Sequence, residues 1–161
     1  MTIEYFWFNE RAAPPQLMLS HLEDIGRLVE HLTMRPQTMD RARISAVGGN
    51  GTRTVFAIER DAFPGAHPDG RIIGTGSLVP VRTPSDHYGL ITDVIVIDRY
   101  TPHTEGIMPR MVEMLIAEAR RLGLNHVDHV SAPERPELNW LYPNAGFELL
   151  KTNTYRLALK A

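Results

Sequence analysis

The sequence predicts an α/β or α+β fold, in which helices pack on a central sheet. Tyr88 to Ile97 contains a nearly continuous apolar run, as expected of a central strand that is covered on both faces. Ile107 to Leu122 then places its apolar side chains on one helical stripe, and His126 to Ser131 follows as a short strand. A strand, a helix and a strand in this order indicate a right-handed parallel crossover.

Length and composition favour an ordinary globular domain. The chain has 161 residues, of which 43% are hydrophobic and 22% charged, so one domain with a real core is expected. The formal net charge is -2 and no basic run stands out, which argues against a nucleic-acid or anionic-membrane partner. No cysteine is present, which excludes disulfides and a thiol nucleophile. Neither a membrane span nor a secretory signal is evident, so we expect a cytoplasmic protein.

Residues 1–15 predict an N-terminal extension. Ile3 to Phe8 is aromatic and β-prone, and Ala13-Pro14-Pro15 ends it. The favoured interpretation is an extra edge strand or a strap across the core. The functional alternative is a homodimer contact or a lid over a substrate pocket.

The next segment predicts a short strand and two helices. Gln16 to Leu19 has the strand pattern, and Ser20 with Glu23 forms a capping box that starts a helix. Thr38 to Val47 is a weaker helical segment, which the glycine-rich residues 48–51 should stop.

Two strands with a long connection should follow. Thr52 to Arg60 and Arg71 to Val81 have strand patterns, and the proline- and glycine-containing link between them predicts a long-looped hairpin. Gly74 and Gly76 weaken the second strand, or allow a bulge or the close approach of a ligand.

The end of the chain predicts one more helix and one more strand. Gly123 should cap the long helix in the left-handed conformation. Pro136 suits the first turn of a helix that runs to about Tyr142 or Asn144, and Gly146 should stop it. Glu148 to Leu159 has the pattern of a last strand.

The link from Asp98 to Met108 leads into the long helix and predicts an anion site. Backbone N–H groups are unpaired at a helix N-terminus, which carries about half a positive charge. Such an end can bind phosphate or pyrophosphate, and Gly106 would let the backbone approach it closely. One glycine is a weak signal, because many helices begin this way.

From about Gln16 onward, the element order and several motifs resemble the GNAT acetyltransferase superfamily. That family has an apolar strand, a glycine-rich loop, a long amphipathic helix and a later Asn-x-Leu-Tyr segment followed by Gly-Phe. The matching residues are Asp93–Val96, Tyr100, Gly106–Ile107, Ala117–Arg120, Asn139–Tyr142, Gly146–Phe147 and Thr152–Arg156. The resemblance implies a single domain over 1–161, a mixed, mostly antiparallel sheet with helices on both faces, and acetyl-CoA as co-substrate.

The glycine-rich loop departs from the family pattern. Residues 101–109 make it about two residues longer, its arginine is absent, and two of the usual glycines are missing. Met108 stands where a small residue normally admits the phosphate, and Glu105 would repel a pyrophosphate if it pointed inward. His103 or Arg110 could supply compensating positive charge.

Carried over residue by residue, the resemblance implies a set of cofactor-binding positions. They are Val94, Ile95, Val96, His103, Thr104, Glu105, Gly106, Ile107, Met108, Asn139 and Tyr142. The residues 94–96 would offer backbone groups to the pantetheine arm, and 104–108 would meet the pyrophosphate. Asn139 would lie beside the cofactor.

The resemblance also implies two catalytic residues. Tyr142 would protonate the departing CoA thiolate, and a phenol pKa near 10, above a thiol pKa near 8.5, means that this group is still protonated at neutral pH. Asp93 would accept the proton of the attacking amine. The alternative for Tyr142 is a core tyrosine on a helix face, and the alternative for Asp93 is an aspartate that holds backbone N–H groups. Glu105 and His87 are weaker candidates for the base.

Histidine and aspartate side chains on the predicted strand from His126 to Ser131 do not indicate a metal site. His126 and Asp128 would share one face of that strand, while His129 would point to the other. We therefore expect surface residues and no metal.

The sequence thus predicts an N-acetyltransferase that passes an acetyl group from acetyl-CoA directly to a primary amine of a small molecule or peptide. The alternative is a catalytically impaired CoA-binding or regulatory module with the same fold, which the degenerate loop favours. Neither reading predicts a nucleic-acid or membrane partner.

Overall fold

The computed structural model describes residues 2–8, 19–60, 70–97, 106–131 and 136–159. The chain forms two compact units, residues 1–130 and residues 131–161, which are treated separately below.

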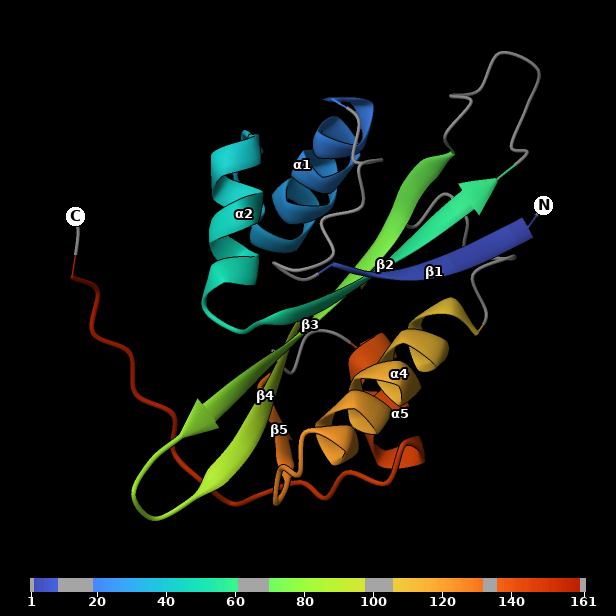
Figure 1. Ribbon diagram of the computed structural model, residues 1–161. Coiled ribbons are helices and arrows are strands. Elements are labelled where there is room, and N and C mark those ends of the chain that lie inside the picture. Colours follow the sequence, from blue (N-terminus) through green and yellow to red (C-terminus); the bar gives the residue numbers. More distant parts are fainter. Residues whose placement is uncertain (1, 9–18, 61–69, 98–105, 132–135, 160–161) are drawn as a thin grey trace. The chain divides into compact units, whose positions relative to one another are not determined.

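A five-stranded sheet is the centre of the first unit (Figure 1). Its strands lie side by side in chain order: β1 (Thr2–Phe8), β2 (Arg53–Arg60), β3 (Arg71–Arg82), β4 (His87–Val96) and β5 (Val127–His129). The first four strands pair antiparallel, and β5 pairs parallel with β4. The mixed, mostly antiparallel sheet and the parallel crossover are therefore confirmed.

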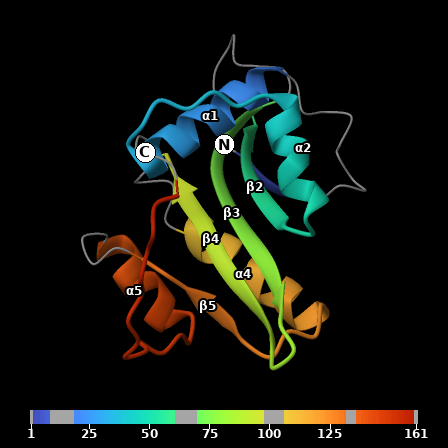
Figure 2. The same cartoon turned by 90° about the vertical axis from the view of Figure 1, so that its left-hand side faces the viewer.

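Helices cover both faces of this sheet (Figures 1 and 2). Helix α1 (Leu19–Thr33) and helix α2 (Arg41–Gly49) lie on one face, and helix α4 (Ile107–Arg121) lies on the other. The core under α1 and α2 comprises Phe8, Leu22, Ile25, Leu28, Ile44, Phe56, Ile72 and Ile95. Each of these side chains is almost fully removed from water, which is the main source of stability for such a layer.

Glycines on β3 allow α4 to pack closely on the sheet. A Cβ atom on Gly74 would lie 3.2 Å from the Met111 Cε atom, and one on Gly76 would lie 3.1 Å from the Leu115 Cδ1 atom. The predicted irregularity is present, because the register between β3 and β4 shifts at Gly76. The group that approaches both glycines is a helix of the same chain, and the predicted approach of a ligand stays a prediction. Gly123 has φ 66° and donates its N–H to Arg120 O, as predicted for the end of α4.

Two predicted boundaries in the first half are wrong. Leu19 begins α1 instead of ending a strand, and residues 16–18 lie outside the described residues. Helix α2 continues through Gly48 and Gly49, and the chain turns at Gly51 with φ 83°. Asp40 caps this helix, because its side chain accepts the N–H of Arg43 at 2.7 Å.

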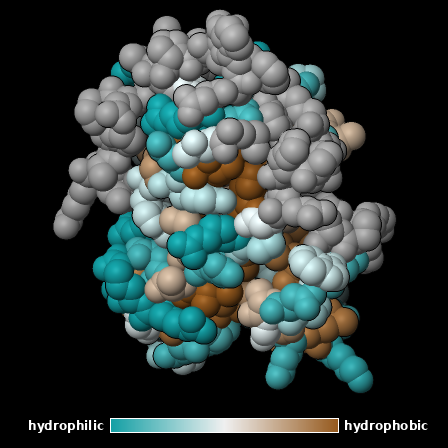
Figure 3. Space-filling view, turned by 90° about the vertical axis from the view of Figure 1, so that its right-hand side faces the viewer, coloured by the Kyte–Doolittle hydropathy of each residue, from teal (hydrophilic) through white to brown (hydrophobic). Residues whose placement is uncertain are grey.

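The N-terminal segment forms β1, the edge strand that was predicted. It pairs with β2 in one register from Thr2 opposite Arg60 to Phe8 opposite Thr54. Tyr5 and Trp7 are only half-buried. Apolar surface is visible on the side of the molecule shown in Figure 3. Residues 9–15 of the predicted extension lie outside the described residues.

The second unit contains helix α5 (Pro136–Asn144) and an extended C-terminal segment. The helix agrees with the prediction. The predicted strand over Glu148–Leu159 is wrong, because the structure describes these residues as extended chain outside any strand. None of the described helices combines the length and apolar character needed to cross a membrane.

Candidate active site

Strand β4 is kinked at Asp93. Thr75 lies opposite Ile95 and Ser77 lies opposite Thr92, so Asp93 and Val94 together oppose the single residue Gly76. Asp93 has φ 55°, in the left-handed region that disfavours residues with a side chain. Such a bulge bends its strand and redirects a side chain, and bulges are frequent beside active sites.

The Asp93 carboxyl group has an altered acidity. The residue is exposed at the sheet surface. Surrounding protein nevertheless desolvates the carboxyl group and raises its pKa, while the Thr92 hydroxyl donates a hydrogen bond of 3.3 Å that opposes the shift. Desolvation disfavours the charged form, so this carboxylate holds a proton more readily than an ordinary aspartate. That property suits a general base. The alternative for Asp93 was a structural role, in which its carboxyl group accepts hydrogen bonds from backbone N–H groups. Among the described residues, no backbone N–H donates to this carboxyl group.

Beyond Ile91, the outer edge of β4 has no neighbouring strand among the described residues. The parallel ladder with β5 runs only from Gly89 opposite Val127 to Ile91 opposite His129. On the β3 side, Ile97 N–H donates to Ile73 O at 2.9 Å. Because backbone groups alternate between the two edges of a strand, Val96 and Val94 direct theirs away from β3. An extended ligand can bind such an edge as an added strand would.

The side chains of Val94, Ile95 and Val96 are buried and support this edge from within. The backbone groups of Val94 and Val96 are therefore the part available to a ligand, whereas Ile95 pairs with Thr75 of β3. A role of these residues in cofactor binding stays a prediction. The sequence pattern could identify this strand because its apolar run is long.

Helix α4 begins at Gly106, which has φ 103° and no side-chain cap. The first turn holds Ile107, which is buried, and Met108, which is half-buried. Pro109 lacks an N–H group, so the number of donors at this end is reduced. Arg110, considered as a compensating charge, lies 3.1 Å from Glu113 and pairs with it. His103, Thr104 and Glu105 lie outside the described residues.

The two candidates on α5 differ in exposure. Tyr142 is buried, and its ring packs edge-on against Phe147 with the centroids 5.0 Å apart. Asn139 is exposed. Phe147 N–H donates to Tyr142 O at 3.0 Å, which fixes the turn after the helix. The Gly-Phe pair thus supports the tyrosine within its own unit.

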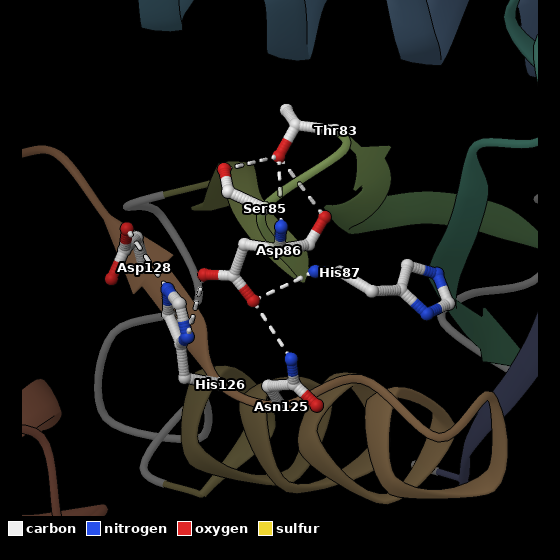
Figure 4. Close-up of polar contacts among 7 residues, drawn as sticks. All are labelled: Thr83, Ser85, Asp86, His87, Asn125, His126 and Asp128. Atoms are coloured by element: carbon white, nitrogen blue, oxygen red, sulfur yellow. Dashed lines mark hydrogen bonds and ion pairs between the residues drawn. The ribbon is translucent and has the colours of Figure 1, made fainter.

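The turn between β3 and β4 is joined to the start of β5 by a group of polar residues, which we name the turn cluster: Thr83, Ser85, Asp86, His87, Asn125, His126 and Asp128 (Figure 4). Asp86 Oδ1 accepts hydrogen bonds from the Asn125 side chain at 2.8 Å and from His87 N–H at 2.7 Å. His126 lies between two carboxylates, with Nδ1 3.7 Å from Asp86 and Nε2 3.8 Å from Asp128. These contacts fix the turn against β5.

Hydrogen bonds to the ionised Asp86 lower its pKa. The Asn125 side chain is the largest cause, followed by the His87 backbone, and electrostatic interaction with the His126 and His87 side chains adds to the effect. The turn cluster is thus held by a carboxylate that stays charged.

The structure does not bring the remaining histidine candidates together. His87 Nε2 accepts from the Arg82 guanidinium at 3.0 Å in the turn cluster, and His129 Nδ1 lies 2.9 Å from Ile91 O. Across the residues that the structure describes, no group of three or more His, Asp or Glu side chains could hold a metal ion. Sequence reasoning missed Thr92, whose only signal is its place beside Asp93.

Comparison with known proteins identifies the class of fold. No protein-family model matches the sequence, and no curated protein matches it. Solved acetyltransferase structures do match the fold over nearly the whole chain. The chain therefore has the fold of GNAT-type acetyltransferases, as the sequence motifs predicted.

Three solved structures illustrate the match. An acetyltransferase of Trypanosoma brucei is 21% identical, with a TM-score of 0.73 over 98% of this chain and 100% of that chain. Glucosamine-6-phosphate N-acetyltransferase from Arabidopsis thaliana is 16% identical, with a TM-score of 0.62 over 98% and 99%. A predicted acetyltransferase from Clostridium acetobutylicum, solved with acetyl-CoA, is 16% identical, with a TM-score of 0.65 over 98% and 97%.

Proposed function

We propose that this protein is an N-acetyltransferase that moves an acetyl group from acetyl-CoA to a primary amine. The observation that carries the proposal is the kinked β4, which exposes an unpaired backbone edge beside Asp93 and leads toward the N-terminus of α4. The shared fold supports it, and the Clostridium acetobutylicum neighbour was solved with acetyl-CoA.

The residues present fit acetyl-CoA in part. The free backbone groups of Val94 and Val96 suit an amide-containing arm, since an extended amide chain can pair with them as a strand does. Gly106 begins α4 without a side-chain cap, so N–H groups of the first turn can meet a phosphate. We assign residues 103–108 to the pyrophosphate and Asn139 to the side of the cofactor.

Two side chains would move protons in this reaction. As the amine nitrogen bonds to the thioester carbonyl carbon, the carbon–sulfur bond breaks and the nitrogen loses a proton. Asp93 accepts that proton, and the Tyr142 hydroxyl donates one to the departing sulfur. A phenol keeps its proton at neutral pH, so the Tyr142 hydroxyl has a proton to give as negative charge develops on the departing sulfur.

The acceptor that we propose is an amine on a small molecule or peptide. Neighbours with this fold include an enzyme that acts on glucosamine-6-phosphate, which carries a primary amine on a sugar. The exposed Asp93 carboxylate also favours a cationic group nearby.

Thiol release tests the assignment of Tyr142. The protein is incubated with acetyl-CoA and a panel of amines, and free CoA is followed with time. We expect Tyr142→Phe to lower kcat by about a hundredfold while the Kd of acetyl-CoA changes little, because only the proton donor is lost. Trp140→Phe on the exposed side of α5 is the matched control. An unchanged kcat in Tyr142→Phe would remove this residue from the mechanism.

A second candidate is a CoA-binding or regulatory module without catalysis. It is favoured by the start of α4, where Met108 and Pro109 occupy the first turn and Arg110 is paired with Glu113. Thermal unfolding with CoA and acetyl-CoA separates the readings, because a ligand of the folded state raises Tm. Stabilisation with no thiol release for any amine would favour the module.

A further inference from the structure

Both ring nitrogens of His126 face a carboxylate in the turn cluster (Figure 4). Nδ1 is 3.7 Å from an Asp86 oxygen, and Nε2 is 3.8 Å from an Asp128 oxygen. A neutral imidazole has one N–H group and one lone pair, whereas the protonated ring has two N–H groups. The lone pair of a neutral ring would therefore face a negative oxygen, and only the protonated ring directs an N–H group toward both carboxylates.

The ring of Tyr88 lies against the face of the same histidine. The centroids of the two rings are 5.2 Å apart, and the ring planes are 5° from parallel. A cation within about 6 Å of an aromatic ring is attracted by the negative face of that ring. The turn through Asp86, β4 through Tyr88 and β5 through Asp128 thus each attract a protonated His126.

His87 is the other histidine of the turn cluster, and its contacts differ. Its Nε2 accepts a hydrogen bond from Arg82 Nε at 3.0 Å, so this nitrogen carries a lone pair. A second proton on the His87 ring would remove that acceptor and place a positive charge beside the guanidinium. Protonation therefore strengthens the contacts of His126 and weakens those of His87.

His126 lies where β5 joins β4. Its backbone oxygen accepts the Gly89 N–H at 3.0 Å, and the Asn125 N–H donates to His87 O at 2.8 Å. Strand β5 has three residues, Val127–His129, so few backbone hydrogen bonds can hold it to β4. Side-chain contacts at the start of β5 therefore contribute a larger share of this pairing than they would in a long strand.

We propose that His126 is a proton-dependent clamp, which fastens the start of β5 to β4 and to the preceding turn in mild acid and loosens as the ring loses its second proton. An imidazole makes this change between about pH 5 and 8. Asp86 supplies a constant negative charge, because hydrogen bonds from the Asn125 side chain and the His87 backbone lower its pKa. The clamp is a property of the fold and does not depend on acetyl transfer.

Amide hydrogen exchange at about pH 5.5 and about pH 8 tests the clamp. The amides of Gly89 and Asn125 report on it, because their hydrogen bonds join β4 to the start of β5. Each rate is compared with that of an unstructured peptide at the same pH, which gives the protection due to structure. We expect about threefold to tenfold greater protection at the lower pH, since partly exposed ion pairs each contribute weakly. The Ile97 amide, which donates to Ile73 O on the β3 side, should keep its protection.

Three variants assign the effect to its residues. His126→Gln keeps a polar side chain that takes no charge, and it should lose the pH dependence of protection at Gly89 and Asn125. Asp128→Asn should reduce that dependence, because one of the two carboxylates is removed. His31→Gln, at an exposed position of α1, is the matched control and should retain it. Equal protection at both pH values in the wild type would overturn the proposal, and so would an unchanged dependence in His126→Gln.

Discussion

At the scale of single residues, Asp93 combines a backbone conformation that side chains disfavour with a carboxyl group whose pKa is raised. Such strain persists only where the surrounding structure imposes it, and it concentrates at functional sites. Asparagine tolerates the left-handed region and has nearly the same shape, so Asp93→Asn separates the charge from the backbone geometry.

We predict that Asp93→Asn lowers kcat/KM by at least a hundredfold but keeps the fold.

The raised pKa of Asp93 contributes stability below the unfolded value of 3.8, and this contribution is lost as pH rises through the folded pKa. The Asn variant should therefore have a higher Tm than wild type at pH 7, with the difference closing in acid. Asp93→Ala should be about 1 kcal/mol less stable than Asp93→Asn, because alanine lacks this tolerance. Full activity of Asp93→Asn would show that Asp93 is not the general base.

The pKa of Asp86 is shifted in the opposite direction from that of Asp93. Its pKa is lowered, so the ionised form contributes stability above the unfolded value of 3.8, and that stability is lost as pH falls through the folded pKa. We predict that Asp86→Asn lowers Tm at pH 7 and that the difference from wild type shrinks below about pH 4. Thermal scans across pH measure it, with the exposed Glu30→Gln as control. A difference that persists unchanged in acid would contradict the electrostatic role.

At the scale of elements, the contact between β3 and α4 depends on small residues. We predict that Gly74→Ala destabilises the protein by about 1–3 kcal/mol, because the new Cβ lies 3.2 Å from the Ile95 backbone oxygen, which cannot move aside easily. Gly26→Ala in α1 is the control, since its nearest contact is 3.4 Å and alanine favours a helix. Urea unfolding measures both. Equal effects would show that β4 and α4 can both move away from position 74.

The elements also show what a sequence can and cannot predict. Strand β4 was predictable because a strand that is buried on both faces is apolar at nearly every position. Helix α4 was predictable because a helix that is buried on one face repeats its apolar residues with the helical period. The catalytic roles of Tyr142 and Asp93 come from short motifs and stay predictions. The bulge at Asp93 was not, because it arises from the registers of two strands. The segment 148–159 has the strand pattern, yet a pattern cannot say whether a partner edge is available.

At the scale of the whole molecule, the described sheet has two different edges. On one side β1 is a long strand with half-buried aromatic side chains, and a dimer contact through it stays a prediction. On the other side β5 is short and pairs with β4 over three residue pairs. The turn cluster fixes that pairing at one end, and the outer edge of β4 is unpaired beyond it.

In the proposed function, acetyl-CoA binds the edge of β4 after the bulge. Amide hydrogen exchange, followed residue by residue with and without acetyl-CoA, probes this binding at the backbone itself. We expect slower exchange at Val94, Val96 and the first turn of α4 when acetyl-CoA is present, and no such change with acetate alone. Binding of acetyl-CoA without protection at Val94 and Val96, or no binding, would contradict it.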